Sequence, residues 1–246
     1  MSLLYGLIGK KLGHSFSRRH FSEKFAREGT DARYELFELE TIAQFPALLA
    51  AQPDLRGLNV TIPYKTQVIP FLDRCSAEAA AVGAVNTIRR EQDGSLSGHN
   101  TDVYGFRISL EQFLAGEKPA AALVLGSGGA AKAVFYVLDQ LGIPAKGVSR
   151  AAAEGVFTYE SLRHTDLTQY PLIINTTPLG MYPDVEARPD LPMEQIGPAQ
   201  RMFDLIYNPA ETLLMREARE KGARVQNGLD MLILQAERAW EIWNQE

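Results

Sequence analysis

Short apolar runs alternate with segments of helical spacing through the first hundred residues. The pattern predicts strands at 3–8, 34–39 and 57–61, with helices at 18–28 and 42–51. Strands that alternate with helices are typical of a mostly parallel sheet. The segment 66–81 is expected to be mostly helical around Pro70. A hairpin is expected around Asp93 and Gly94, between strands at 85–89 and 96–98.

A second series of elements begins near residue 103. It comprises a helix at 105–115, a linker at 115–119, a strand at 121–126, a helix at 129–141 and further strands at 145–149, 172–177 and 201–207. The strand at 121–126 is uninterruptedly apolar, as expected where both faces of a sheet are covered. From about residue 229 an apolar stripe at helical spacing predicts a final helix. We place the change of domain between residues 100 and 118.

The amino-acid composition argues against several classes of partner and site. Apolar residues make up 46% and charged residues 22%, and the net charge is −5, which argues against a partner that is a nucleic acid or an anionic membrane. No apolar run reaches the roughly 20 residues that span a bilayer. The single cysteine, Cys75, excludes an intrachain disulfide and a cysteine-based zinc site, and the histidines lack HExxH spacing. We therefore expect a cytoplasmic protein without a metal.

The sequence "VLGSGGAAKA" follows the apolar strand at 121–126 and opens the next helix. It matches G-x-G-x-x-G/A, with Gly126, Gly128 and Ala131 at the three small positions. In this context the first glycine permits a tight turn, the second lets the backbone approach a pyrophosphate, and the helix N-terminus attracts the anion. A dinucleotide site is the favoured interpretation, and a glycine-rich loop without a ligand is the alternative.

The end of the following strand distinguishes NADP from NAD. An acidic residue there would bind the ribose 2′-hydroxyl of NAD, but the sequence has Ser149 and Arg150, with no acid before Glu154. A guanidinium can bind a 2′-phosphate, whereas a carboxylate would repel it. NADP is therefore favoured. The alternative is that Arg150 is an ordinary surface arginine.

Polar side chains collect where the predicted strands of the first domain end. They are Ser15 and Ser17, then Asn59, Thr61 and Lys65, then Asn86 and Thr87, and finally Asn100, Thr101 and Asp102. Ligands of open α/β sheets bind beyond the carboxyl ends of the strands. Hydroxyl, amide, lysine and aspartate groups suit a small, oxygen-rich ligand. Individually these residues also have plain interpretations, since Ser15 and Ser17 could cap a helix and Lys65 could be a solvated loop lysine.

These segments resemble the shikimate dehydrogenase family along nearly the whole chain. The resemblance is carried, in the family's order, by "SFS", "NVTIPYK", "GAVNT", "GHNTDVYG", "GSGGAAKA", "NTTPLGM", "FDLIYNP" and "GLDMLILQA". It implies a two-domain enzyme that reduces 3-dehydroshikimate to shikimate with NADPH in aromatic amino-acid biosynthesis. Two positions depart from the family's pattern: Arg18 stands where a proline is usual, and Phe21 where an asparagine is usual.

The resemblance also implies roles for individual residues. Lys65 and Asp102 would be the catalytic pair. The substrate would lie among Ser15, Ser17, Thr61, Lys65, Asn86, Asp102, Tyr207 and Gln235. NADP would lie on Gly126, Ser127, Gly128, Gly129, Ala130, Arg150, Leu205 and Gly228. Either Lys65 or Asp102 could move the proton, and our hypothesis is Lys65 as acid/base with Asp102 as its partner.

The expected fold class is therefore α/β, with two domains. A substrate-binding domain with a mainly parallel sheet spans residues 1–102 and is rejoined by the helix 229–246, and a Rossmann-like NADP-binding domain spans 103–228. Two alternatives stay open: a quinate or dual quinate/shikimate dehydrogenase that uses NAD or NADP, and a non-catalytic ligand-sensing module on the same scaffold. The protein could be a monomer or a homodimer.

Overall fold

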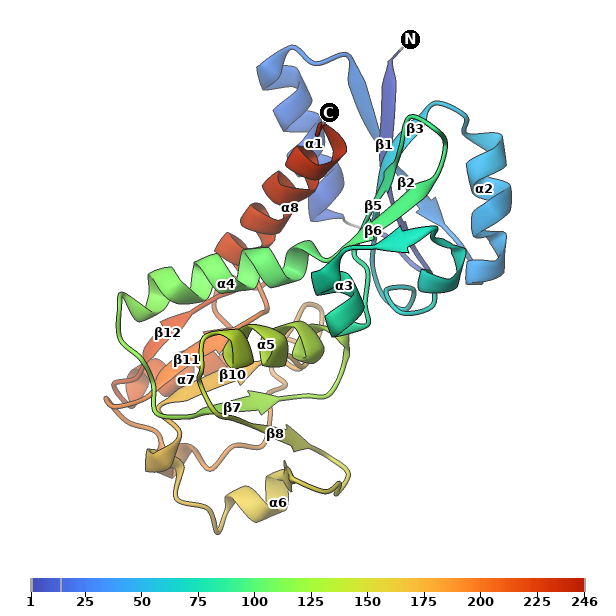
Figure 1. The fold of residues 1–246 in the computed structure, drawn as a ribbon. Coiled ribbons are helices and arrows are strands. Elements are labelled where there is room, and N and C mark those ends of the chain that lie inside the picture. The colour runs from blue at the N-terminus through green and yellow to red at the C-terminus, as the bar shows by residue number, and fades with distance from the viewer. Residues whose placement is uncertain (1, 14, 246) are drawn as a thin grey trace. The chain divides into compact units, whose positions relative to one another are not determined.

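The computed structural model describes residues 2–13 and 15–245 and divides them into two compact units. Unit 1 consists of residues 1–101 and 236–246, and unit 2 of residues 102–235. Each unit contains one six-stranded sheet, and Figure 1 labels most of the helices and strands. The sequence assigned the whole final helix to the first domain, whereas the division of the structure falls within that helix, after residue 235.

Unit 1 contains a sheet of mixed parallel and antiparallel strands, with helices on both faces. Its strands are β1 (Leu3–Gly9), β2 (Ala32–Glu38), β3 (Leu55–Val60), β4 (Arg74–Cys75), β5 (Thr87–Arg90) and β6 (Leu96–His99). Its helices are α1 (Phe16–Glu28), α2 (Phe45–Ala51), α3 (Ala77–Val82) and the second half of α8 (Leu229–Trp243), with 3₁₀ turns at Ile42–Gln44 and Ile69–Phe71. The strand order is β2-β1-β3-β5-β6-β4.

The pairing within this sheet follows from the connections. β1 pairs in parallel with β2 and β3, as the intervening helical segments predict. The hairpin predicted around Asp93 and Gly94 is confirmed, because β5 and β6 are antiparallel and β5 also runs antiparallel to β3. The first residues of β5 consequently lie beside the last residues of β3, with Asn59 opposite Thr87. We call this end of the sheet, at the carboxyl end of β3, its polar edge.

The expectation of a mostly helical segment at 66–81 is wrong. The segment holds a 3₁₀ turn at Ile69–Phe71, the two-residue strand β4 and only the short helix α3. Pro70 sits inside the 3₁₀ turn, and Asp73 accepts a hydrogen bond from the backbone N–H of Leu96 at 2.7 Å. Ser76 then caps α3 by accepting from the N–H of Ala79. Contacts with a distant strand thus outweigh the helical propensity of this segment.

Unit 2 is built around an all-parallel sheet. Its strands are β7 (Ala122–Leu125), β8 (Ala145–Ser149), β9 (Val156–Thr158), β10 (Leu172–Asn175), β11 (Arg201–Asp204) and β12 (Arg224–Gln226). Its helices are α4 (Thr101–Leu114), α5 (Gly129–Gln140), α6 (Tyr159–Leu162), α7 (Leu213–Glu220) and the first half of α8, with 3₁₀ turns at Leu167–Gln169 and Met193–Gln195. The strand order β12-β11-β10-β7-β8-β9 is the doubly wound order of dinucleotide-binding domains.

Residues of β1 alternate between two hydrophobic clusters of unit 1. Leu4 and Ile8 face the cluster that contains Phe45 of α2, whereas Tyr5 and Leu7 face a cluster rich in aromatic residues between the sheet, α1 and α8. The aromatic cluster includes Phe21, Phe25, Tyr34, Trp240 and Trp243. Both faces of β1 are therefore covered, which is why this strand reads as an apolar run.

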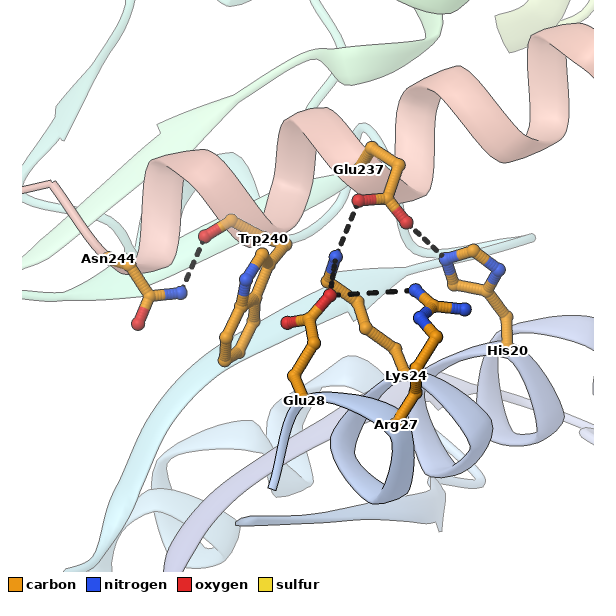
Figure 2. A network of polar contacts seen from close by, with 7 residues as sticks. All are labelled: His20, Lys24, Arg27, Glu28, Glu237, Trp240 and Asn244. Carbon is orange, nitrogen blue, oxygen red and sulfur yellow. Dashed lines mark hydrogen bonds and ion pairs between the residues drawn. The ribbon is translucent and has the colours of Figure 1, made fainter. Parts of the chain in front are cut away.

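A polar network joins α8 to α1 beside this aromatic cluster, as Figure 2 shows. Glu237 bonds the Nε2 atom of His20 at 2.9 Å and the Nζ atom of Lys24 at 2.7 Å, and Lys24 also donates to Glu28 at 2.8 Å. Burial alone would lower the pKa of Lys24, but the two carboxylates outweigh it and the pKa is raised. The network therefore compensates a buried charge and fixes α8 against α1.

Within residues 2–13 and 15–245, no helix has both the length and the apolar character needed to cross a bilayer.

Candidate functional site

Three segments of unit 1 bring predicted substrate residues to one edge of its sheet. Thr61 follows β3, and its N–H donates to the carbonyl of Ile8 at the end of β1, at 2.9 Å. The carbonyl of Lys65 accepts from the N–H of Val85 at 2.7 Å, directly before Asn86. Since β1 lies between β2 and β3, this edge is a topological switch point, where α/β sheets bind ligands.

The amide of Asn86 is held in one orientation. This residue is 4% exposed, and its Oδ1 atom accepts from the N–H of Thr101 at 2.7 Å and from the hydroxyls of Thr87 and Thr101, each at 3.2 Å. The carbonyl end of the amide faces these donors, so its Nδ2 end faces the other way. Asn86 is therefore a preorganised hydrogen-bonding group at the same edge as Thr61 and Lys65.

The first turn of α1 carries the two predicted serines. Ser15 is the N-cap of α1, and its side chain accepts from the N–H of Arg18 at 3.4 Å. The helix thus begins normally although Arg18 replaces the proline usual in the family. On β2, Tyr34 is 3% exposed, and its hydroxyl donates to the Oδ1 atom of Asn59 at 2.7 Å. Tyr34 was not singled out from the sequence, where it reads as one apolar position of an alternating strand.

In unit 2 the predicted residues Asp102 and Gln235 lie on two helices that cross closely. Asp102 stands in the first turn of α4 and is 5% exposed. Gly105 follows it by three positions, on the same helix face. A Cβ atom at Gly105 would come within 2.5 Å of the carbonyl of Met231 and 3.1 Å of the Cβ atom of Gln235. This glycine therefore lets α4 and α8 approach at the level of Asp102 and Gln235.

The glycine-rich turn lies between β7 and α5, where the strand order of unit 2 reverses. Gly126 has a φ of +110°, and a Cβ atom there would lie 2.6 Å from the Oγ1 atom of Thr176, which follows the neighbouring strand β10. Gly128 is the N-cap of α5 and makes no side-chain capping bond. The amides of the first turn, which includes Gly129 and Ala130, are thus oriented to receive an anion, with Ser127 exposed beside them.

Two further predicted cofactor residues lie together at the ends of β11 and β12. The N–H of Gly228 donates to the carbonyl of Ile206 at 3.0 Å, and a Cβ atom on Gly228 would overlap the carbonyl of Leu205. Tyr207 continues the same loop and is partly buried. Arg150 follows β8, which pairs with β7, and its side chain is exposed. The structure therefore brings Leu205 and Gly228 into contact, and Arg150 directly follows β8, the strand that pairs with β7.

A buried carboxyl group that was not predicted from the sequence supports this loop. Asp204 is fully buried at the end of β11. Its Oδ1 atom accepts from the Nδ2 atom of Asn175 at 3.0 Å and from the N–H of Ile206 at 3.1 Å, and its Oδ2 atom accepts from the hydroxyl of Thr212 at 2.7 Å. Burial raises its pKa to about 6, although these three bonds oppose the shift.

The raised pKa of Asp204 predicts a pH-dependent stability of unit 2. An unfolded aspartate titrates near 3.9, so the folded protein retains the proton between pH ~4 and ~6. The contribution of the protonated Asp204 carboxyl to the free energy of unfolding is complete below pH ~4, and it is lost as the pH rises through about 6. Relative to Asp204→Asn, which cannot titrate, the wild type should lose about 3 kcal/mol of unfolding free energy over this window.

Denaturant unfolding at several pH values, followed by circular dichroism, checks this prediction. Fluorescence would report unit 1 instead, because both tryptophans, Trp240 and Trp243, lie there. A difference between wild type and variant that stays constant from pH 4 to pH 8 would contradict the raised pKa.

Among the described residues, no group of three or more His, Cys, Asp or Glu side chains is arranged to hold a metal ion.

The chain is similar in sequence and in fold to known proteins. A family model described as the shikimate dehydrogenase substrate binding domain matches residues 7–88. The chain is 41% identical to the shikimate dehydrogenase (NADP(+)) of Geobacillus kaustophilus, over 99% of this chain and 93% of that protein. The chain's fold is also similar to those of two solved structures.

The first is the Thermus thermophilus shikimate 5-dehydrogenase in complex with NADP(H) and shikimate, with a TM-score of 0.84 and 33% identity, over 98% of this chain and 93% of that one. The second is the quinate dehydrogenase of Corynebacterium glutamicum in complex with NAD, with a TM-score of 0.89 and 27% identity, over 99% and 94%.

Proposed function

We propose a function on the premise that this chain belongs to the shikimate dehydrogenase family. It catalyses the reversible NADPH-dependent reduction of 3-dehydroshikimate to shikimate, a step of chorismate and aromatic amino-acid biosynthesis. The observation that carries this conclusion is the 41% identity to a named NADP-dependent relative over 99% of the chain. The polar edge of unit 1 and the glycine turn of unit 2 supply the two kinds of site that this reaction requires.

We propose eight substrate residues, those that the family resemblance implies: Ser15, Ser17, Thr61, Lys65, Asn86, Asp102, Tyr207 and Gln235. They combine hydroxyl, amide, ammonium and carboxylate groups, which match the hydroxyls, the carboxylate and the ketone oxygen of the substrate. The fixed amide of Asn86 and the close crossing of α4 and α8 support this assignment, because preorganised groups bind a rigid ring with little loss of entropy.

Lys65 is the proposed acid/base. Reduction adds a hydride to the carbonyl carbon, and the electron pair of the C=O bond moves to the oxygen. The Nζ ammonium of Lys65 stabilises that developing negative charge and transfers a proton to it, so that an alcohol forms; in the oxidation the amine takes the proton back. The hydrogen bond between the Lys65 carbonyl and Val85 holds the base of this side chain beside the sheet edge.

Asp102 is the proposed partner of Lys65. Its carboxylate accepts a hydrogen bond from a substrate hydroxyl and orients the reacting ring. Asp102 lies in the first turn of α4, where the positive end of the helix dipole favours a negative charge. This position suits a residue that acts as a carboxylate.

NADP fits the glycine turn of unit 2 and, when bound, supplies or accepts the hydride. Gly126 allows the turn beside Thr176, and the amides at the start of α5 receive the pyrophosphate. Leu205 and Gly228, which approach each other closely, are further proposed cofactor residues. Arg150 is the proposed partner of the 2′-phosphate.

Initial rates with shikimate and with quinate, each with NADP and with NAD, test this proposal. The highest kcat/KM is expected for shikimate with NADP. A preference for quinate, or for NAD, would instead support the quinate dehydrogenase alternative. Absence of turnover with all four pairs would favour a ligand-sensing module. We also propose a cytoplasmic location, with the protein acting as a monomer or a homodimer.

Arg150→Ala is expected to raise the KM for NADP about tenfold and leave the KM for NAD unchanged. The reason is that a charge-assisted bond to the 2′-phosphate contributes roughly 1.5–3 kcal/mol, and NAD lacks that phosphate. Arg163→Ala provides the control, since Arg163 is an exposed arginine of unit 2 that pairs with Asp190 at 2.9 Å. Equal changes in both KM values for Arg150→Ala would argue against a 2′-phosphate contact.

A further inference from the structure

The last residues of β10 and β11 bend the segments that follow them in the same way. Asn175 and Asp204 are paired in the sheet, and both are fully buried. The Oδ1 atom of Asn175 accepts from the N–H of Thr177 at 3.0 Å, and the Oδ1 atom of Asp204 accepts from the N–H of Ile206 at 3.1 Å. Such bonds to the backbone two residues further on form Asx turns. We call these four residues the paired turns.

A side-chain bond joins the two turns to each other. The Nδ2 atom of Asn175 donates to the Oδ1 atom of Asp204 at 3.0 Å, and its Oδ1 atom also accepts from the hydroxyl of Thr177 at 2.7 Å. An amide nitrogen only donates and an amide oxygen only accepts, so the amide of Asn175 has a single orientation. The paired turns are therefore held as one unit, in which Asp204 fixes Asn175 as well as its own turn.

On one side the paired turns contact the glycine-rich turn. Thr176 lies inside the Asn175 turn, and both its N–H and its hydroxyl donate to the carbonyl of Leu125, at 2.9 and 2.7 Å. Leu125 ends β7 and directly precedes Gly126, where a Cβ atom would lie 2.6 Å from the Oγ1 atom of Thr176. The place of the glycine-rich turn thus depends on the Asn175 turn.

On the other side the paired turns contact Leu205 and Gly228, two of the proposed cofactor residues. Leu205 lies inside the Asp204 turn, and its N–H donates to the carbonyl of Asn175 at 3.0 Å. The carbonyl of Ile206 accepts from the N–H of Gly228, also at 3.0 Å. The backbone around Leu205, and the contact of Gly228 with it, therefore depend on the side chain of Asp204.

We infer that Asp204 is a positioning residue for the dinucleotide: through the paired turns it holds Leu205 and Gly228 in a fixed place relative to Gly126. Asp204 is itself fully buried and acts through these neighbours. The inference deepens the proposed function and rests on it, because the three neighbours belong to the proposed NADP site. Groups that fix a binding site before the ligand arrives act on its affinity, so loss of the Asp204 carboxyl should weaken NADP binding.

Asp204→Ala is expected to raise the Kd for NADP about tenfold or more, because the N–H of Ile206 and the amide of Asn175 lose their shared acceptor. Titration calorimetry at pH 8, above the pKa of Asp204 of about 6, measures the change without reference to turnover. Asn175→Ala is the second variant and replaces the first if Asp204→Ala does not fold. It breaks the bond between the turns but leaves Asp204 its bonds from Ile206 and Thr212, and the same rise is expected.

Asp204→Asn separates positioning from charge. The oxygen of the introduced amide can accept from Asn175 and Ile206, and its nitrogen can donate to the hydroxyl of Thr212, so the paired turns persist without a carboxylate. The Kd for NADP should therefore stay within about threefold of wild type. A rise as large as that of Asp204→Ala would mean that the charge matters and the turns do not, and it would overturn the inference.

Thr212→Val is the matched control for loss of stability. Thr212 is 1% exposed, donates to the Oδ2 atom of Asp204 at 2.7 Å and caps α7 by accepting from the N–H of Met215 at 3.3 Å, but it lies outside the paired turns. This variant should lower the denaturant midpoint and leave the Kd for NADP within about twofold of wild type. Equal rises in Kd for Thr212→Val and Asp204→Ala would reduce Asp204 to a stabilising residue and overturn the inference.

The wild-type protein distinguishes failure of this inference from failure of the proposed function. If the wild type binds NADP, and whichever of Asp204→Ala and Asn175→Ala folds keeps the Kd within about twofold, this inference alone is wrong. If the wild type does not bind NADP, the proposed function and this inference fail together.

Discussion

Lys65→Ala should lower kcat for shikimate oxidation at least ~100-fold, the lower end of the range for a general acid/base group. The variant removes the proposed proton acceptor and the cation that stabilises charge on the reacting oxygen. The backbone bond from Val85 to the Lys65 carbonyl is independent of the side chain, so the local fold should persist. Steady-state kinetics at saturating NADP measures the effect. Lys146→Ala, at an exposed lysine of β8, is the control and should match wild type.

A second substitution at this position separates proton transfer from charge stabilisation. Lys65→Arg keeps a positive charge, but a guanidinium does not release its proton in proteins. If Lys65 moves the proton, the arginine variant should remain as impaired as Lys65→Ala. Recovery to within about tenfold of wild type would instead assign Lys65 an electrostatic role and leave proton transfer to Asp102. Turnover of Lys65→Ala near the wild-type value would refute both assignments.

Gly126→Ala should raise the Kd for NADP at least about tenfold. A residue with a Cβ atom is strained by roughly 1–3 kcal/mol in such a backbone conformation, and here φ is +110° and the added atom would meet the Oγ1 atom of Thr176 at 2.6 Å. Relaxing this overlap displaces the turn that leads into α5 and, with it, the amides that receive the pyrophosphate. Titration calorimetry with NADP measures the loss without reference to turnover.

Gly116→Ala provides the matched control for this prediction. Gly116 also belongs to unit 2 and has a φ of +87°, but a Cβ atom there would have no neighbour within 4 Å. It should cost some stability and leave the Kd for NADP unchanged. Equal losses of affinity in both variants would mean that the effect reflects general destabilisation. An unchanged Kd in Gly126→Ala would place the pyrophosphate elsewhere.

Elements with local causes were predictable from the sequence. The strand, turn and helix around Gly126 were expected at 121–126 and 129–141, and they occur as β7 (Ala122–Leu125) and α5 (Gly129–Gln140). An apolar run followed by glycines is enough to specify this strand, turn and helix, without contacts from distant parts of the chain. The candidate residues Thr61, Lys65 and Asn86 were likewise visible as polar groups at strand ends, and the structure places the first and last of them on adjoining strand ends.

Features that depend on distant partners were not predictable. The two-residue strand β4 exists because β6 pairs with it and because Asp73 bonds the backbone of Leu96. Tyr34 looks like any apolar strand position until Asn59 is placed against its hydroxyl. Asp204 gives no sign in the sequence that Asn175 and Thr212 will surround it. A buried tyrosine or aspartate does require a partner, but the sequence does not name it.

The placement of α8 sets an order for the assembly of the newly made chain. Unit 1 needs the second half of this helix, since Trp243 donates from its Nε1 atom to the carbonyl of Ile88 at 2.9 Å and packs in the same cluster as Tyr5. That half is synthesised only after all of unit 2. Domains usually fold in the order in which they leave the ribosome. We therefore expect unit 2 to complete its folding before unit 1. Until the second half of α8 has been made, an apolar surface of unit 1 stays exposed and can bind chaperones.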